Sequence, residues 1–166
     1  MLQLDPAAAD EASDKNIAIL IEKFSQLKHN VENIGTDLHR LDRTNEHFPP
    51  KGFKKALEEA VAKYGDVATA FNALIDRVTA EVTSQTSISV QDYDTSLTGV
   101  QNRYNELASA YKAVKGHSIQ TASMGAVFEV LYDLGKKAWE WLSNSQNKAN
   151  LDKLKTLKIV PYVALS

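Results

Sequence analysis

Two residue types that commonly shape small proteins are absent or rare in this chain. It has no cysteine among 166 residues, which excludes disulfide bridges, thiol nucleophiles and thiolate metal sites. Its four prolines are Pro6, Pro49, Pro50 and Pro161, so none interrupts residues 51–160. Proline in a helix interior removes a hydrogen bond and clashes with the preceding turn. Its absence from this stretch therefore leaves room for long helices.

An excess of charge of one sign is also lacking. The chain has 19 lysines and arginines against 21 acidic residues, a formal net charge of −2, so we expect no nucleic-acid partner. The most apolar run, residues 122–134, is shorter than the roughly 20 residues of a membrane-spanning helix. No secretory signal pattern opens the sequence, so a cytoplasmic location is the default expectation.

Apolar residues recur instead at alternating spacings of three and four, which places them along one side of a helix. Four segments carry the pattern: Ile17, Leu20, Phe24, Leu27, Val31, Ile34, Leu38 and Leu41; Leu57, Ala60, Tyr64, Val67, Phe71, Leu74 and Val78; Tyr93, Leu97, Val100, Tyr104, Leu107, Tyr111 and Val114; Met124, Val127, Leu131, Leu134, Ala138 and Trp141. The pattern predicts an all-α protein, an antiparallel up-down four-helix bundle with long coiled-coil-like helices and a short C-terminal extra helix or extended tail. A long coiled-coil hairpin is the competing architecture. The second segment has a wider apolar stripe, which favours several neighbours and hence the bundle.

Breaks in the pattern set the predicted boundaries. The Pro49-Pro50 corner ends the first helix, a polar linker follows Thr83, and Gly116 suits the position just after a helix. We predict a flexible acidic lead-in over 1–12, a bundle over 13–146 with helices at about 13–46, 51–83, 90–115 and 118–143, and a short helix and apolar tail over 147–166 packed on the bundle.

Motifs that would carry catalysis or bind a metal or cofactor are not found. There is no His-Glu-x-x-His, Gly-x-Gly-x-x-Gly, Walker loop or Gly-x-Ser-x-Gly. In the register of the first helix, His29, Glu32 and His39 fall on positions that face solvent, so we expect no di-metal site. We therefore predict no catalytic residue, no metal site, no cofactor and no enzyme activity.

Three tyrosines share the apolar seam of the third segment. Tyr93, Tyr104 and Tyr111 are expected to pack in the core, with their hydroxyl groups either hydrogen-bonded or emerging at the edge of the bundle. The alternative is that they line a ligand pocket.

The fourth segment and the end of the chain hold more apolar surface than one seam requires. We predict a partner-binding surface made of two groups, Phe128, Tyr132, Trp139 and Leu142 on the fourth helix, and Ile159, Val160, Tyr162 and Val163 in the tail. Three hypotheses remain open for the tail. It folds back over Tyr132 and Trp139, it docks on another chain, or it is a membrane-active element beside the lysines of residues 136–158.

The sequence thus predicts a non-catalytic helical bundle that acts through protein–protein interaction or self-association. A membrane-active bundle, such as a subunit of an α-helical pore-forming assembly, is the first alternative. A ligand-sensing bundle or an enzyme with a pocket built from distant residues is the second.

Overall fold

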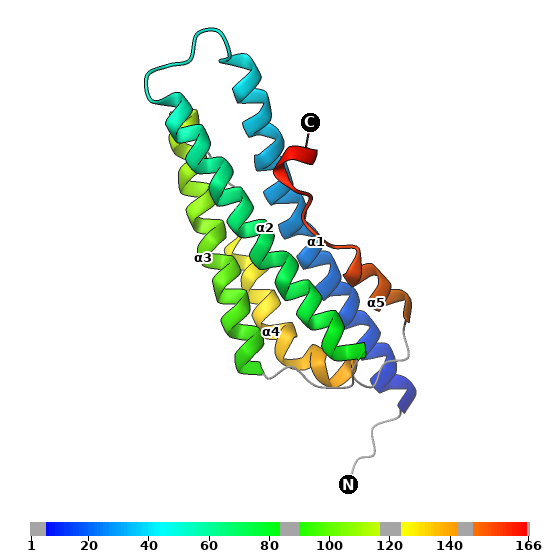
Figure 1. The fold of residues 1–166 in the computed structure, drawn as a ribbon. Helices are drawn as coiled ribbons and strands as arrows, with labels where there is room; N and C mark the ends of the chain where they lie inside the picture. Colours follow the sequence, from blue (N-terminus) through cyan, green and yellow to red (C-terminus); the bar gives the residue numbers. More distant parts are fainter. Residues whose placement is uncertain (1–5, 84–89, 117–123, 143–147, 166) are drawn as a thin grey trace.

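A computed structural model of the protein describes residues 6–83, 90–116, 124–142 and 148–165. These residues form helices and contain no strand (Figure 1). The helices are α1 (Pro6–Thr44), α2 (Phe53–Thr83), α3 (Val90–Lys115), α4 (Gly125–Leu142), the short α5 (Lys148–Lys155) and a single 3₁₀ turn, η1 (Tyr162–Ala164). The prediction of an all-helical protein with four long helices is confirmed.

The ends of the helices differ from the predicted bounds in one informative place. Helix α1 begins at Pro6, so the segment predicted as an acidic lead-in is helical over most of its length. Proline is favoured in the first turn of a helix, where its missing N–H has no partner to lose, and three alanines follow it. The predicted start of the fourth helix, at residue 118, lies outside the described residues. Gly116 has the positive φ of +74° expected after a helix, and its N–H donates to the Lys112 carbonyl at 2.9 Å.

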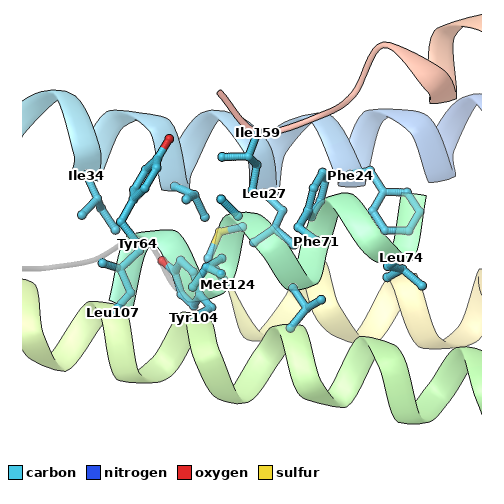
Figure 2. Close-up of a cluster of buried hydrophobic side chains, with 14 of the residues drawn as sticks. Phe24, Leu27, Ile34, Tyr64, Phe71, Leu74, Tyr104, Leu107, Met124 and Ile159 are labelled. Carbon is cyan, nitrogen blue, oxygen red and sulfur yellow. The ribbon is translucent and has the colours of Figure 1, made fainter. Parts of the chain in front are cut away.

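The apolar pattern of the sequence lies in the core. Every patterned position of the second and third segments is buried, as are all those of the first segment except the half-buried Leu41. Among the patterned positions of the fourth segment, Met124, just before α4, and Val127 and Leu131 of α4 are buried, while Leu134 is half-buried. Figure 2 shows side chains from α1, α2 and α3, such as Phe24, Phe71 and Leu107, in one cluster with Met124, which directly precedes α4. The 3.5-residue spacing therefore identified the buried face of each helix.

The four long helices pack together as a bundle. Helix α2 packs most extensively on α3, and α1 on α4, while contacts between α1 and α2 and between α3 and α4 join the two pairs. Helix α5 and the residues after it lie on the outside of this bundle, beside α1 and α2 (Figure 1). This placement brings the end of the chain onto a seam between two long helices.

Candidate functional site

The most elaborate polar site of the described residues surrounds the end of the chain. Residues 157–165, here called the tail, leave α5 and run along the seam between α1 and α2, here called the groove. The Ile159 side chain is only 2% exposed and reaches the core beside Leu27 (Figure 2). An extended segment that lies against helices must find partners for its main-chain N–H and C=O groups outside itself. For Ile159 and Val160, those partners are side chains of α1 and α2.

Asn72 of α2 holds both main-chain groups of Ile159. Its Oδ1 accepts a hydrogen bond from the Ile159 N–H at 2.7 Å, and its Nδ2 donates to the Ile159 carbonyl at 3.1 Å. A carboxamide has one acceptor and one donor side, which matches the N–H and C=O of a single extended residue. Asn72 therefore recognises the main chain of the tail rather than its sequence.

Val160 is held from both sides of the groove. Its N–H donates to Glu32 Oε2 of α1 at 3.0 Å, and its carbonyl accepts from the Tyr64 hydroxyl of α2 at 2.6 Å. Lys28 also pairs with Glu32, at 2.8 Å between Nζ and Oε1. Burial, followed by the nearby Glu32 carboxylate, raises the pKa of Tyr64 well above its usual value, so the hydroxyl remains a donor.

Tyr162 closes the upper end of the groove over His39. The two rings stack with centroids 3.9 Å apart and planes 10° apart, and His39 Nε2 lies 2.7 Å from the Tyr162 carbonyl oxygen. The Tyr64 ring meets Tyr162 edge-on, with centroids 5.8 Å apart. One aromatic side chain of the tail is thus fixed by a stacking contact, an edge contact and a main-chain hydrogen bond.

The groove is narrow because α1 carries a glycine where the tail and Tyr64 approach. A Cβ atom on Gly35 would lie 2.5 Å from Leu165 Cδ1 and 2.7 Å from Tyr64 Cε2. Gly35 lies three residues after Glu32 and four before His39, so the three share one stripe of α1. On α2 the corresponding stripe runs through Tyr64, Ala68, Asn72 and Asp76 at intervals of four.

The predicted solvent exposure of Glu32 and His39 on the first helix is wrong. Glu32 and His39 were placed on the solvent side of α1 by the heptad register, but the Glu32 side chain is 14% exposed and His39 is half-buried under the tail. The register describes how a helix faces its bundle neighbours and contains no information about an additional segment that packs outside the bundle. A glycine in the middle of a long helix, Gly35, was the available signal of such a close approach.

The predicted partner-binding residues that the structure describes lie in separate places. Ile159, Val160 and Tyr162 lie in the groove, and Val163 is 89% exposed at its upper end. Phe128 is 2% exposed and faces Tyr104 with ring centroids 6.1 Å apart. The side chains of Trp139 and Leu142 lie outside the described residues.

Of the three hypotheses for the tail, folding back over Tyr132 and Trp139 of the fourth helix does not match the described contacts, which place α5 and η1 on α1 and α2. Tyr132 of α4 is half-buried, and its hydroxyl contacts Thr98 Oγ1 of α3 at 2.6 Å and Gln101 Oε1 at 3.2 Å. The polar tip of Tyr132 is therefore satisfied by α3, whereas the main-chain groups of Ile159 and Val160 find their donors and acceptors on α1 and α2.

The tyrosines of α3 have the hydroxyl partners that burial requires. Tyr93 donates to the Leu131 carbonyl at 2.9 Å, Tyr104 accepts from Asn30, and Tyr111 donates to Asp37. Burial of Asp37 opposes its ionisation, but hydrogen bonds from Tyr111, Arg40 and Lys115 outweigh this effect and lower its pKa. These contacts tie α3 to α1 and α4 along the core.

A hollow lies between α2 and α3 on the outside of the bundle. Its volume is about 540 Å³, and Lys63 and Glu106 form an ion pair beside it with 3.3 Å between Nζ and Oε2. The residues that line it are Ala56, Glu59, Lys63, Asn105, Glu106, Ser109, Ala110 and Ala113. Small and exposed polar side chains dominate this lining, and they provide less specific recognition than the groove.

Within the described residues, no group of three or more histidine or acidic side chains is arranged to hold a metal ion. None of the helices, over the same residues, has a stretch long and apolar enough to cross a membrane. In the structure, the groove binds the extended main chain and one aromatic side chain of the tail.

Comparison of the chain with protein-family models, with curated proteins and with solved structures found no match.

Proposed function

We propose that the protein is a non-catalytic helical bundle that acts through contacts with other protein chains, made at the groove and at the tail that lies in it. The observation that carries the proposal is the hydrogen bonding of the tail. Both main-chain groups of Ile159 and of Val160 are bound by side chains of α1 and α2. Recognition of an extended main chain by fixed side chains is a common way for proteins to bind segments of other proteins.

The outer side of the tail supports contact with a second chain. Val163 is 89% exposed, although its neighbour Tyr162 is fixed against His39. An apolar side chain that is held in position but faces solvent loses little conformational entropy when a partner covers it. Both self-association and a different protein partner fit this arrangement.

We also infer that the four long helices alternate in direction, as an antiparallel up-down bundle. The supporting cross-helix pairs are Phe24 with Phe71, Lys63 with Glu106, Arg77 with Asp92, Tyr93 with Leu131, Tyr104 with Phe128, Asn30 with Tyr104, and Asp37 with Tyr111. Residue numbers fall along one helix as they rise along the other for α2 with α3 and for α3 with α4. They rise together for α1 with α3, as expected for diagonal helices of such a bundle.

A pore-forming role receives less support than protein contact. It would require α4 to leave the bundle and enter lipid. Helix α4 would then lose the burial of Phe128 and Leu131, and Tyr93 would lose the carbonyl that it binds.

The absence of cysteine makes the proposal directly testable. A single Val163→Cys substitution, labelled with a benzophenone photo-crosslinker, places the probe on the exposed side of the tail. Asp133→Cys on the exposed side of α4 is the matched control. We expect one discrete adduct from position 163, either a dimer of the pure protein or a complex with one protein from its own cells. Sedimentation velocity over a wide concentration range then separates self-association from a distinct partner.

The comparison of the two labelled positions decides the outcome. An adduct from position 163 that is absent from position 133 supports the proposal. Equal yields from both positions would indicate random collision, and no adduct from either position would remove the support for a contact surface at the tail.

A further inference from the structure

We propose that the groove is an exchangeable peptide-binding site, which accepts an extended segment of another protein in place of the tail. The segment would carry the pattern basic, aliphatic, any residue, proline, aromatic, which matches residues 158–162. This inference rests on the proposed function and names the chemistry of the partner that the groove fits.

The first two positions of the pattern are set by a charge and by a core site. Lys158 Nζ lies 2.6 Å from Asp76 Oδ1, in a pair that remains half-exposed and so selects for sign more than for affinity. Ile159 inserts into the apolar cluster beside Leu27, with 2% of its surface exposed (Figure 2). A compact aliphatic side chain suits this position, because a charged one would be buried without a partner.

The third and fourth positions are read through the main chain. Val160 has both main-chain groups bound while its side chain is half-exposed, so the groove places little demand on side-chain identity there. Pro161 has φ −58° and ψ 146°, the polyproline II conformation that proline adopts without ordering cost. It also has no N–H that would need an acceptor in the groove.

The fifth position is aromatic because its receptor is a stack. His39 lies parallel to the Tyr162 ring, and Tyr64 meets the same ring with its edge. An aliphatic side chain could not form either ring contact. His39 Nε2 beside the carbonyl of this residue fixes the register of the whole segment.

The arrangement favours exchange because the binding groups belong to the bundle rather than to the tail. Glu32, His39, Tyr64 and Asn72 project from α1 and α2, whose apolar faces are packed in the core. A tethered tail competes at an effective concentration in about the millimolar range, so a free segment binds measurably only when the tail is weakened. A tail whose contacts with the groove are weakened, or that is bound elsewhere, would therefore leave the groove free for another segment.

The test uses the full chain with Ile159→Asp, which places a charge at the buried anchor and displaces the tail. The probe is a fluorescein-labelled decapeptide with the sequence of residues 157–166, and anisotropy measures its binding. We expect saturable binding to this variant and far weaker binding to the wild-type chain. Adding Asn72→Ala should weaken binding by about tenfold or more, because two hydrogen bonds to the peptide main chain are lost. Adding the exposed Asn105→Ala should have no effect.

Peptide variants test the pattern itself. Replacing isoleucine with aspartate or tyrosine with alanine in the peptide should each abolish or strongly reduce binding, while replacing the valine between isoleucine and proline with threonine should change it little. Binding that ignores these changes, or that survives Asn72→Ala, would overturn the proposal. So would an Ile159→Asp chain that is folded by circular dichroism, fails to bind the peptide and floats with anionic phosphatidylserine vesicles, since that result assigns the released tail to a membrane.

If Ile159→Asp prevents folding, the wild-type chain answers the same question. At high peptide concentration, exchange should increase the hydrogen-exchange rates of the Ile159 and Val160 amides, and unchanged rates would contradict exchange. The experiments distinguish failure of peptide exchange from failure of the proposed function. A persistent adduct from Val163→Cys with no peptide binding rejects exchange alone, whereas loss of that adduct rejects contact through the tail.

Discussion

Asn72 makes two hydrogen bonds to one residue of the tail, so its amide cannot be replaced by a group of the same shape. Asn72→Asp keeps the acceptor for the Ile159 N–H. It replaces Nδ2, which donates to the Ile159 carbonyl oxygen at 3.1 Å, with a carboxylate oxygen that cannot donate. We expect the free energy of unfolding to fall by about 1–3 kcal/mol, because a partly buried hydrogen bond is replaced by repulsion. Urea denaturation measures the loss. Asn105→Asp, on the exposed side of α3, is the control and should change stability by less than about 0.5 kcal/mol.

Gly35 and Gly65 are both helical glycines, but only one lies under a neighbour. A Cβ on Gly35 meets Leu165 Cδ1 and the Tyr64 ring below 3 Å, whereas a Cβ on Gly65 meets nothing within 4 Å. Alanine gains about 1 kcal/mol over glycine in a helix interior. We therefore expect Gly65→Ala to raise the melting temperature. Gly35→Ala should lower it, because overpacking costs typically 1–3 kcal/mol and the Tyr64 ring cannot move aside without breaking its bond to Val160. A rise of the same size for both variants would show that the tail yields easily at this point.

At the scale of helices, an ionic contact ties α1 to α3 and gives stability a pH dependence. Asp37 of α1 accepts hydrogen bonds from Tyr111 and pairs with Lys115 of α3, 3.1 Å from Nζ to Oδ2. Although burial opposes ionisation, these bonds lower the pKa of Asp37 below its usual value in the folded protein. The unfolded chain therefore binds this proton more readily, so the stabilisation is complete above about pH 4 and is lost as the pH falls further.

Asp37→Asn isolates this contribution. The variant should be less stable than the wild type at neutral pH, and the gap between the two should narrow as the pH falls below about 4, because only the wild type loses the ionised group. Urea denaturation at several pH values measures both proteins. Curves that stay parallel across the acid range would mean that Asp37 titrates alike in the folded and unfolded states.

The helices also show which features could be predicted from the sequence and which could not. The burial of Leu20, Val67 or Leu107 depends only on the repeat within each helix, and that repeat is visible in the sequence. The place where the tail packs depends on which seam between helices offers matching polar groups. That match is a property of two folded helices together and not of either helix alone. Asn72 and Glu32 look like ordinary exposed polar residues until an extended segment lies across them. The apolar surface of the fourth helix therefore suggests Tyr132 and Trp139 as one possible site for the tail, whereas nothing in the sequence indicates the seam between α1 and α2.

For the whole molecule, the C-terminal part is held by far fewer buried side chains than the bundle. Among the described side chains of residues 152–165, only Leu154 and Ile159 are buried, whereas the long helices share one continuous core. Segments with few buried apolar contacts open at lower free energy than the rest of a protein. The tail should therefore detach while the bundle remains folded, which is the condition that exchange of the tail requires.

Native-state hydrogen exchange tests this division into two units. The Ile159 and Val160 amides bind Asn72 and Glu32, so their exchange reports opening of the tail. We expect a lower opening free energy for these amides than for core amides such as Leu27 and Phe71. Asn72→Asp should lower the value for the tail further and leave the most protected core amides changed only by the loss in global stability. If tail and core amides share one opening free energy, the tail is part of the cooperative core. A partner segment could then reach the groove only when the whole bundle unfolds, and binding would be as rare as global unfolding itself.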